Sequence, residues 1–459
     1  MPPPRRAIAD VPIEEAVGRA LALHRAGRKA QAELAYRDVL KRAPRHPHAL
    51  HFYGMWLRER GKTAAAIDHL ERSLQAAPGD IQVENNLAGL YLIAERREDA
   101  ERLFVALLAK APEAAPTRFN LGVLYARSKR WEESVVQLEA ARALIVDVDV
   151  LRELGDALVE VKRFEEGVAA HREALAIDPN DAEQKKRVCQ AYFRLVDDLD
   201  RKLVEPQIAI AHLGSWLEID PDDAIAKHTL AAYEGRGAPA RCSDDYVRRT
   251  FDLFAASFDD VLGALRYAGV QRAVVALDAT LGPSASPPTA TVVDAGCGTG
   301  ALGPLVRARC ARLIGVDLSP RMVERARARG VYDEVHEAEL TRWLEAKHQA
   351  VDAIVCADTV IYFGDVEPLA RAMVGALRPG GVLVLTVEAW LTTDPDATYR
   401  LERHGRYSHA LAYLTSALAA AGAEIIATEE LPAIRVEFGA DVPGTIVTAR
   451  SRSVSGKRA

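Results

Sequence analysis

The sequence has few residues of the kinds that build disulfide-bonded, metal-binding or membrane-spanning proteins. Its 459 residues include 5 cysteines, and no two of them form a Cys-x-x-Cys pair, so zinc sites and a disulfide framework are disfavoured. No apolar run is long enough to cross a bilayer, and no apolar segment follows the polar N-terminal residues as it would in a secretory signal. We therefore expect a cytoplasmic protein that needs neither a metal nor a membrane.

The chain also lacks an excess of positive charge. It carries 59 Lys and Arg against 65 Asp and Glu, for a net charge of -6, and therefore offers no broad basic surface for phosphates. Nucleic acid is not expected as an obligatory partner. Hydrophobic residues make up 49% and charged residues 27% of the chain, a composition that builds folded cores rather than disorder. At this length we expect two or more domains.

The N-terminal half repeats with a regular period. Proline recurs every 34 residues, at Pro44, Pro78 and Pro112, which is the period of a helix-turn-helix repeat. Small residues recur in step with these prolines, and large residues recur 16 positions after the small ones: Ala20, Gly54 and Ala88, then Tyr36, Leu70 and Phe104. A small residue beside a large one lets the two helices of one repeat pack closely.

Later units follow the same pattern less regularly. Leu121-Gly122 and Leu154-Gly155 mark a fourth and a fifth unit, and a sixth unit runs to Pro221. The pattern resembles the tetratricopeptide repeat family over residues 11 to 234, with about five to six repeats. The resemblance implies an α-solenoid whose concave groove binds a protein partner or a peptide. The alternative is that the small and large positions specify helix stacking alone.

The helical pattern ends at a segment rich in glycine. Residues 235 to 242 predict a linker, and a second domain is expected over residues 243 to 450, followed by a basic tail over residues 451 to 459. The second domain opens with an amphipathic helix predicted for residues 244 to 258. This helix either closes over a ligand or packs on a sheet.

A strand, a glycine turn and a helix follow one another in the second domain. Residues 291 to 294 form a β-branched strand, which leads through Ala295-Gly296-Cys297-Gly298-Thr299-Gly300 into a helix predicted for residues 301 to 310. Glycine leaves the backbone open to a ligand, and a helix start offers free N–H groups. A second strand ends in Asp317, 23 residues after Asp294, where Rossmann-like folds hold ribose hydroxyls.

The charge of this turn distinguishes two nucleotide cofactors. Residues 296 to 300 lack the glycine spacing that seats the pyrophosphate of NAD, and Asp294 before the glycines would repel phosphate. The same carboxylate attracts the cationic amino-acid end of S-adenosylmethionine. We therefore predict S-adenosylmethionine as the cofactor.

Residues 291 to 450 resemble the class I methyltransferases, and the whole chain resembles bacterial predicted methyltransferases that contain tetratricopeptide repeats. The resemblance implies an α/β doubly wound, Rossmann-like domain with a mostly parallel sheet. It assigns cofactor binding to the glycine turn and to residues after the second, third and fourth strands: Asp294, Gly296, Cys297, Gly298, Gly300, Asp317, Leu318, Met322, Glu339, Leu340 and Asp358. Further strands are expected at residues 351 to 358, 382 to 387, 423 to 429, 433 to 438 and 444 to 450.

Methyl transfer is an in-line displacement that depends on aligning the acceptor with the methyl group, and a base helps when the acceptor must lose a proton. The candidate catalytic bases are Asp358, Glu388, His404 and His409. Arg406 lies between the two histidines and is predicted to hold a carboxylate. In the alternative interpretation, Ser408 caps a helix over residues 410 to 421, and His409 is solvated in its first turn.

The predicted function is transfer of a methyl group to a small molecule or a protein, with the repeats docking the substrate or a partner. The alternative is a protein-interaction scaffold that carries an inactive methyltransferase fold. The intact glycines, Asp294 and Asp317 favour the enzyme, because an interaction protein does not need them.

Overall fold

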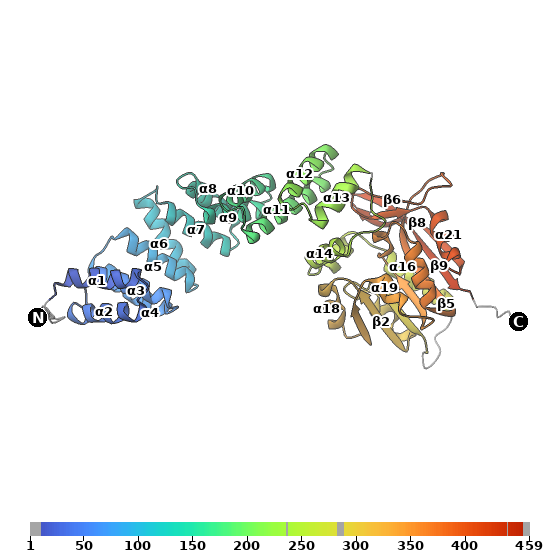
Figure 1. Ribbon diagram of the computed structural model, residues 1–459, viewed down its shortest axis with the longest axis horizontal. Helices are drawn as coiled ribbons and strands as arrows, with labels where there is room; N and C mark the ends of the chain where they lie inside the picture. The colour runs from blue at the N-terminus through green and yellow to red at the C-terminus, as the bar shows by residue number, and fades with distance from the viewer. Residues whose placement is uncertain (1–10, 236, 282–288, 438, 453–459) are drawn as a thin grey trace, which may run out of the picture. The chain divides into compact units, whose positions relative to one another are not determined.

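The computed structural model describes residues 11–235, 237–281, 289–437 and 439–452. Most of the predicted basic tail, from residue 453 onward, lies outside these ranges. The chain separates into two compact units, Met1–Leu195 and Val196–Ala459. The described part of the first unit is helical, whereas the second unit combines helices with one sheet (Figure 1).

Helix pairs joined by short turns build the first unit. Each helix packs on its partner and most pairs pack on the next pair. The helices are α1 (Ile13–Arg25), α2 (Lys29–Arg42), α3 (Pro47–Glu59), α4 (Thr63–Ala76), α5 (Ile81–Ile93), α6 (Arg97–Lys110), α7 (Ala115–Arg127), α8 (Trp131–Arg142), α9 (Val148–Glu160) and α10 (Phe164–Ile177). A further helix, α11 (Ala182–Arg201), runs across the boundary between the units. The predicted α-solenoid is confirmed.

The small and large residues of the repeat meet inside each helix pair, as the period predicts. Ala20, Tyr36 and Phe104 are fully buried. A Cβ atom at Gly122 would lie 2.7 Å from the Leu138 Cγ atom on the facing helix, which is closer than carbon atoms approach without a clash. Substituting this glycine would therefore force the two helices apart.

The second unit begins with helices that precede its sheet. They are α12 (Pro206–Ile219), α13 (Ala224–Glu234), α14 (Asp244–Phe254), α15 (Phe258–Ala264) and α16 (Gly269–Leu281). Helix α13 contacts the sheet domain directly, because the His228 Nε2 atom lies 2.8 Å from the Gly405 carbonyl oxygen. Helices α12 and α13, which belong to the predicted sixth repeat, are thus part of the same compact unit as the sheet.

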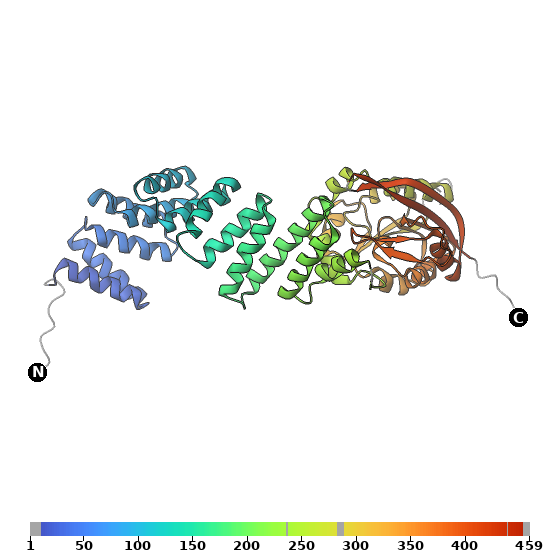
Figure 2. The ribbon, with the colours of Figure 1, turned by 90° about the horizontal axis from the view of Figure 1, so that it is seen from above.

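One sheet forms the centre of the second unit. Its strands are β1 (Thr291–Ala295), β2 (Arg312–Asp317), β3 (Glu334–Glu337), β4 (Val351–Cys356), β5 (Leu377–Ala389), β6 (Tyr399–Leu401), β7 (Tyr407–His409), β8 (Ala423–Glu437) and β9 (Ala440–Ser451). Strands β3, β2, β1, β4 and β5 pair in parallel in that order. Strand β9 then pairs antiparallel with both β5 and β8. The two long strands drawn in red in Figure 2 are β8 and β9.

Helices cover both faces of this sheet. Val292 packs in a core with residues of α16, whereas its neighbour Val293 packs in a core with residues of α20 (Glu367–Ala376) and α21 (Leu411–Ala420). Adjacent strand residues point to opposite faces, so the alternation places a core on each side. The predicted doubly wound α/β class is therefore confirmed. Three short helices complete the unit: α17 (Gly303–Val306), α18 (Pro320–Ala328) and α19 (Leu340–Glu345).

Four sequence predictions about individual elements are wrong. The predicted helix over residues 244 to 258 divides into α14 and α15, and the helix over 301 to 310 shortens to α17 and one 3-10 turn. The strands predicted at 423 to 429 and 433 to 438 are one strand, β8. Its pairing is irregular between Leu431 and Arg435, around Pro432, since proline lacks the N–H that a ladder requires.

The fourth error concerns Ser408 and His409. Both lie in β7, which pairs with β5, and α21 begins two residues later without a side-chain cap. The structure therefore excludes Ser408 as the cap of that helix and His409 as a solvated residue of its first turn. Both side chains are buried.

Ala240 and Cys242, at the end of the predicted linker, are hydrogen-bonded to the sheet domain. The Ala240 carbonyl oxygen accepts a hydrogen bond from the Gly364 N–H at 2.9 Å, and the Cys242 N–H donates to the Tyr362 carbonyl oxygen at 2.9 Å. Residues 240 to 242 are thus held in place after β4 instead of forming a free spacer.

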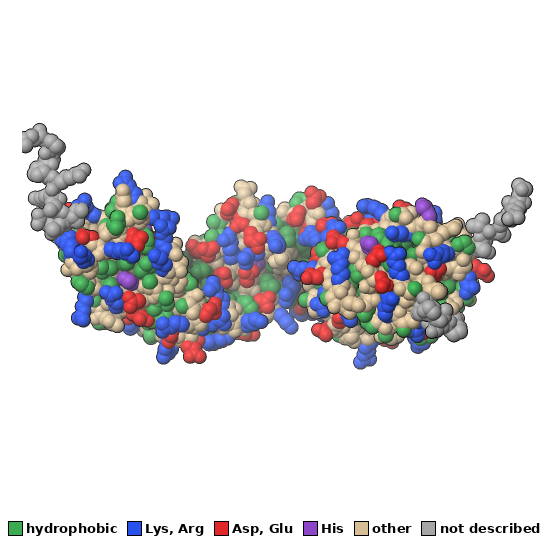
Figure 3. All heavy atoms as spheres, turned by 90° about the horizontal axis from the view of Figure 1, so that it is seen from below, with side chains coloured by type: hydrophobic (Ala, Val, Ile, Leu, Met, Phe, Trp, Pro, Cys, Tyr) green, Lys and Arg blue, Asp and Glu red, His purple; other side chains and the backbone are tan. Residues whose placement is uncertain are grey.

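The surface agrees with the balanced composition. On the face drawn in Figure 3, lysine and arginine side chains alternate with aspartate and glutamate side chains, without a broad region of one charge. Among the residues that the structure describes, no helix has the length and apolar character needed to cross a membrane.

Candidate active site

A cavity of about 980 Å³, measured with its open mouth, lies at the carboxyl ends of β1, β2, β3 and β4. Parallel sheets bind ligands at this edge. Nine of the eleven residues predicted to bind a cofactor line the cavity: Asp294, Gly296, Cys297, Gly298, Asp317, Leu318, Glu339, Leu340 and Asp358. The sequence pattern therefore brings together residues from four strand ends.

The glycine turn after β1 forms one wall of the cavity. Gly296 and Gly298 have φ angles of 80° and 54°, in the left-handed region that glycine adopts without strain. At Gly298, the nearest atom to an added Cβ would be a Phe258 carbon at 3.5 Å. A side chain at Gly298 would therefore project into space that is now open to a ligand.

Gly300 and Met322 do not line the cavity. An added Cβ at Gly300 would lie 2.9 Å from the Tyr332 ring, and Met322 is fully buried in α18. Both residues pack the elements behind the cavity wall.

Asp294 ends β1 and lies almost wholly buried, with 2% of its surface exposed. The Tyr332 hydroxyl donates a hydrogen bond to its Oδ2 atom at 2.7 Å. Burial raises the pKa of Asp294 to about 7, the Tyr332 hydrogen bond opposes this shift, and the nearby Asp317 carboxylate adds to it. The side chain is therefore poised between its neutral and charged forms near neutral pH.

Backbone N–H groups fix the orientation of the Asp317 carboxylate at the end of β2. Its Oδ2 atom accepts a hydrogen bond from the Gly298 N–H and its Oδ1 atom accepts one from the Ser319 N–H, each at 2.9 Å. Burial raises the pKa of Asp317, and these backbone donors act in the opposite direction. Each carboxylate oxygen keeps a second lone pair for a ligand.

Helices α14 and α15 form the wall opposite the sheet. Phe251 and Phe258 from these helices line the cavity. Their neighbours bind the loops that follow β1 and β2. The Asp252 Oδ1 atom accepts a hydrogen bond from the Ser319 hydroxyl at 2.6 Å, and the Asp259 Oδ1 atom accepts one from the Thr299 hydroxyl at 2.5 Å. These helices thus contribute to the cavity wall, and their closing over a ligand stays a prediction.

Glu339 lines the cavity and also caps α19. Its two carboxylate oxygens accept hydrogen bonds from the Thr341 and Arg342 N–H groups at 3.1 and 2.9 Å. The Arg241 guanidinium from the segment after α13 lies 3.6 Å from the same carboxylate. Capping α19 is therefore a structural reason for an acidic residue at position 339, in addition to its predicted contact with a ligand.

Asp358 is held in a strained backbone conformation after β4. Its φ angle is 58°, in a region that residues other than glycine seldom occupy. Its N–H donates to the Thr386 hydroxyl oxygen at 2.8 Å, and its carboxylate accepts a hydrogen bond from the Arg435 guanidinium at 2.8 Å. Strained positions of this kind occur at functional sites. The sequence analysis missed Arg435.

Asp358 belongs to a buried group of charged side chains. Arg435 and Glu388 are each 2% exposed and form an ion pair. The Arg406 Nε atom lies 3.2 Å from Glu388 and the same guanidinium pairs with Glu437. Arg406 is thus engaged by two acids of the protein itself, which leaves the predicted role of holding an acceptor carboxylate without support.

The two histidines predicted as bases lie away from the cavity lining. The His404 Nε2 atom is 3.3 Å from Glu388, and the His409 Nε2 atom is 2.7 Å from the Phe363 carbonyl oxygen. Burial lowers the pKa of His404 to about 4, with a contribution from Arg406, and burial also lowers the pKa of His409 to about 4. Of the residues in the predicted catalytic set, Asp358 lines the cavity.

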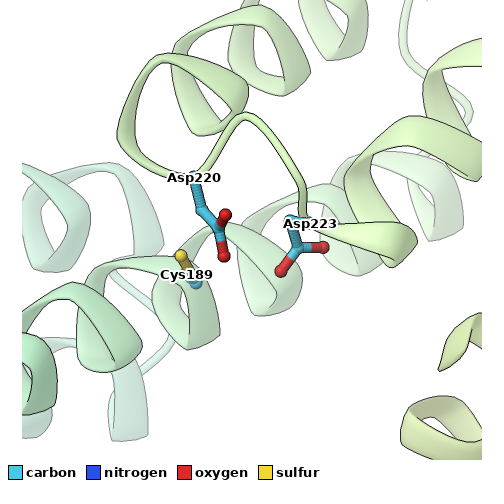
Figure 4. Close-up of side chains that lie close together, drawn as sticks. All are labelled: Cys189, Asp220 and Asp223. Atoms are coloured by element: carbon cyan, nitrogen blue, oxygen red, sulfur yellow. The ribbon is translucent and has the colours of Figure 1, made fainter.

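Acidic residues at the turn between α12 and α13 also have partners within the protein. Figure 4 draws Asp220 and Asp223 at this turn. The Asp223 Oδ1 atom accepts hydrogen bonds from the Ile225 and Ala226 N–H groups, each at 2.9 Å. Its Oδ2 atom pairs with Arg249 of α14 at 2.8 Å. This acid therefore begins α13 and fastens it to α14.

Family models match the two parts of the chain separately. One tetratricopeptide repeat model matches residues 17–81 and 86–145, and a second matches residues 57–114. A model described as a methyltransferase domain matches residues 293–385, which contain the end of β1, the glycine turn and β2 to β4.

Curated relatives match part of the chain. Trans-aconitate 2-methyltransferase of Paracidovorax citrulli is 34% identical over 96 residues, which are 20% of this chain and 37% of that protein. Ubiquinone biosynthesis O-methyltransferase of Xanthomonas campestris is 30% identical over 103 residues, 22% of this chain and 43% of that protein. The chain thus spans less than half the length of these two relatives. Methyltransferase-like protein 27 of Homo sapiens is 29% identical over 38% of this chain and 72% of that protein.

Among solved structures, the [4+2]-cyclase SpnF matches with a TM-score of 0.40 and 19% identity, over 46% of this chain and 97% of that chain.

The matches of the repeat and domain family models agree with the helix pairs, the doubly wound sheet and the glycine turn described above. The chain therefore carries tetratricopeptide repeats in its N-terminal half and a methyltransferase domain in its C-terminal half.

Proposed function

We propose that the protein is an S-adenosylmethionine-dependent methyltransferase whose cofactor binds at the carboxyl ends of β1 to β4. The observation that carries this proposal is the pair of carboxylates that line the cavity, Asp294 and Asp317, on either side of a glycine turn that leaves space at Gly298. Asp317 accepts the ribose hydroxyls, and Asp294 attracts the ammonium group. Leu318, Glu339 and Leu340 contact the adenine.

The bound cofactor supplies a methyl group already activated on a sulfonium. The residues of this chain orient the reactants and exclude water. Phe251 packs edge-on against Phe258 and Tyr362, with ring centroids 5.8 and 5.3 Å apart, and these aromatic rings shield the cavity from solvent. Asp358 stands at the cavity edge, with one carboxylate oxygen held by Arg435. Its remaining lone pairs accept a hydrogen bond from the acceptor, which aligns the nucleophile with the methyl group.

The charges of the cavity favour a neutral or cationic acceptor. Its described lining contains four carboxylates, those of Asp294, Asp317, Glu339 and Asp358, and one guanidinium, that of Arg241. Arg241 already pairs with Asp244 at 2.8 Å. A polycarboxylate such as trans-aconitate would meet repulsion here. We therefore propose a small molecule or a protein side chain that donates a hydrogen bond through a hydroxyl or an amine.

Labelled S-adenosylmethionine incubated with the protein and a cell lysate, followed by separation of small molecules from proteins, tests the activity and finds the acceptor. Transfer of label that requires the protein supports the proposal. Cofactor binding without transfer to any lysate component would favour the alternative, a repeat scaffold with an inactive methyltransferase domain.

The affinity for S-adenosylmethionine should depend on pH through Asp294. Burial raises its pKa to about 7 in the free protein, and the cationic ligand binds the ionised form. Above pH 7 the attraction of the ionised Asp294 for the ligand is fully present. Below pH 7 the Asp294 carboxyl group must lose its proton before it can bind the cation. Affinity should then fall by up to about tenfold per pH unit. Calorimetry between pH 5.5 and 7.5 measures this slope together with the protons released.

Asp294→Asn is the control for that measurement. It should bind S-adenosylmethionine more weakly at pH 7.5 and show a shallower pH dependence, with the residual slope due to Asp317, whose pKa is also raised by burial. Equal slopes in the wild type and Asp294→Asn would contradict the role of Asp294.

We further propose that the repeats dock the acceptor or a partner protein. A chain beginning at Ala182 keeps α11, α12 and α13, and with them the contact of His228 with Gly405 and the pair of Asp223 with Arg249 of α14. It should bind S-adenosylmethionine normally and methylate the acceptor with a raised KM, because a remote docking surface contributes equally to the ground and transition states. Steady-state kinetics with the acceptor from the lysate measures both constants, and equal kcat/KM for the two chains would refute docking of the acceptor.

A further inference from the structure

Behind the cavity wall, three glycines leave a slot, and the Tyr332 ring occupies it. An added Cβ would lie 2.9 Å from the Tyr332 ring at Gly300, 2.8 Å at Gly303 and 3.2 Å at Gly315. These glycines belong to the turn after β1, to α17 and to β2. Because each distance is shorter than an ordinary van der Waals contact, glycine at these positions makes room for the ring, which is thereby fixed on three sides.

The hydroxyl of this fixed ring reaches the acid at the end of β1. It donates a hydrogen bond to the Asp294 Oδ2 atom at 2.7 Å. Asp294 lines the cavity, whereas Tyr332 is not among the lining residues. Tyr332 therefore stands behind Asp294, in a position to act on a ligand through that carboxylate.

We propose that Tyr332 is a positioning residue for the cofactor, which holds the Asp294 carboxylate so that its second oxygen receives the ammonium group of S-adenosylmethionine. This inference rests on the proposed function and deepens it. The loop between α18 and β3, which supplies Tyr332, thus becomes part of the cofactor site although it does not touch the cavity.

The surroundings of Asp294 explain why this hydrogen bond matters. Burial raises the pKa of Asp294, and the Asp317 carboxylate from β2 raises it further. The Cys297 and Cys356 thiols, from the glycine turn and β4, also face this carboxylate, and burial raises their own pKa values, so they remain neutral. Tyr332 is the neighbour that lowers the pKa of Asp294 and thereby favours the charged form that binds a cation.

Tyr332→Phe in the full-length chain tests the proposal, because it removes the hydroxyl and leaves the ring in its slot. Calorimetry should show about tenfold weaker binding of S-adenosylmethionine at pH 7, the effect of one hydrogen bond to a charged group. The pH at which affinity begins to fall should also move upward, since Asp294 loses the donor that stabilises its charge. Tyr413→Phe is the matched control, because its hydroxyl bonds Asp365 at 3.0 Å outside the cavity, and it should change neither quantity.

A double variant distinguishes positioning from a general effect on stability. If Tyr332 acts through Asp294, adding Tyr332→Phe to Asp294→Asn should weaken binding little beyond Asp294→Asn alone. Independent, additive losses would overturn the inference, and so would unchanged affinity and pH dependence in Tyr332→Phe when the wild type binds. Failure of the wild type to bind S-adenosylmethionine would instead refute the proposed function, and this inference with it.

Discussion

Arg435→Met is expected to lower the free energy of unfolding of the second unit by about 3–5 kcal/mol, the cost of leaving a buried charge without its partner. Arg435 is 2% exposed and bonds Asp358 and Glu388. Glu388 is equally buried. After the substitution, the Arg406 guanidinium would be left to balance the negative charge of Glu388 without Arg435. Chemical denaturation followed by circular dichroism, fitted for the transition of this unit, measures the change.

Two control variants make the measurement specific. Arg272 pairs at 3.2 Å with Glu429, an acid on the same strand as Arg435, but it is half exposed. Arg272→Met should therefore cost at most about 1 kcal/mol. Adding Glu388→Gln to Arg435→Met removes the uncompensated charge and should recover part of the loss. Equal effects of the Arg435 and Arg272 substitutions would show that the buried ion pairs are not the source of stability.

Asp317→Ala is expected to weaken binding of S-adenosylmethionine by about 3–6 kcal/mol, because two ribose hydroxyls lose hydrogen bonds to a charged acceptor at about 1.5–3 kcal/mol each. The loss corresponds to more than about a hundredfold in affinity. The Gly298 and Ser319 N–H groups that fix the carboxylate would also lose their acceptor. Isothermal titration with S-adenosylmethionine measures the affinity.

Asp352→Ala is the matched control for this variant. Asp352 also belongs to a parallel strand and also accepts a backbone hydrogen bond, from the Thr291 N–H at 2.8 Å. It lies at the opposite edge of the sheet, beside the start of β1. Its loss should change stability and leave affinity intact. Unchanged affinity in folded Asp317→Ala would refute the ribose assignment.

The sequence predicted the elements whose pattern is local. The β-branched residues before Gly296 and the acid at Asp317 identify β1, β2 and the turn between them, since these features depend on neighbours in the chain. The repeat period was equally informative, because the small and large positions recur within each helix pair. Nine of the eleven predicted cofactor residues consequently line one cavity.

Residues that act across the fold were not predictable in this way. Tyr332 lies 38 residues from Asp294, and Arg435 lies 77 residues from Asp358, with no spacing rule that connects them. His404 and His409 illustrate the converse case, in which polar residues close together in the sequence do not line the cavity. Pairing of β7 with β5 buries Ser408 and His409, and pairing between distant strands cannot be recognised in a local sequence pattern.

The hydrogen bonds of residues 240 to 242 have a consequence for exchanging repeat arrays between proteins. A junction placed in the glycine-rich segment would separate α13 from the loop that its His228 contacts, and would cut beside the backbone bonds to Tyr362 and Gly364. If other repeats are joined to this methyltransferase domain, by recombination or by engineering, the junction must therefore lie ahead of α12. The last helix pair, α12 and α13, then stays with the methyltransferase domain.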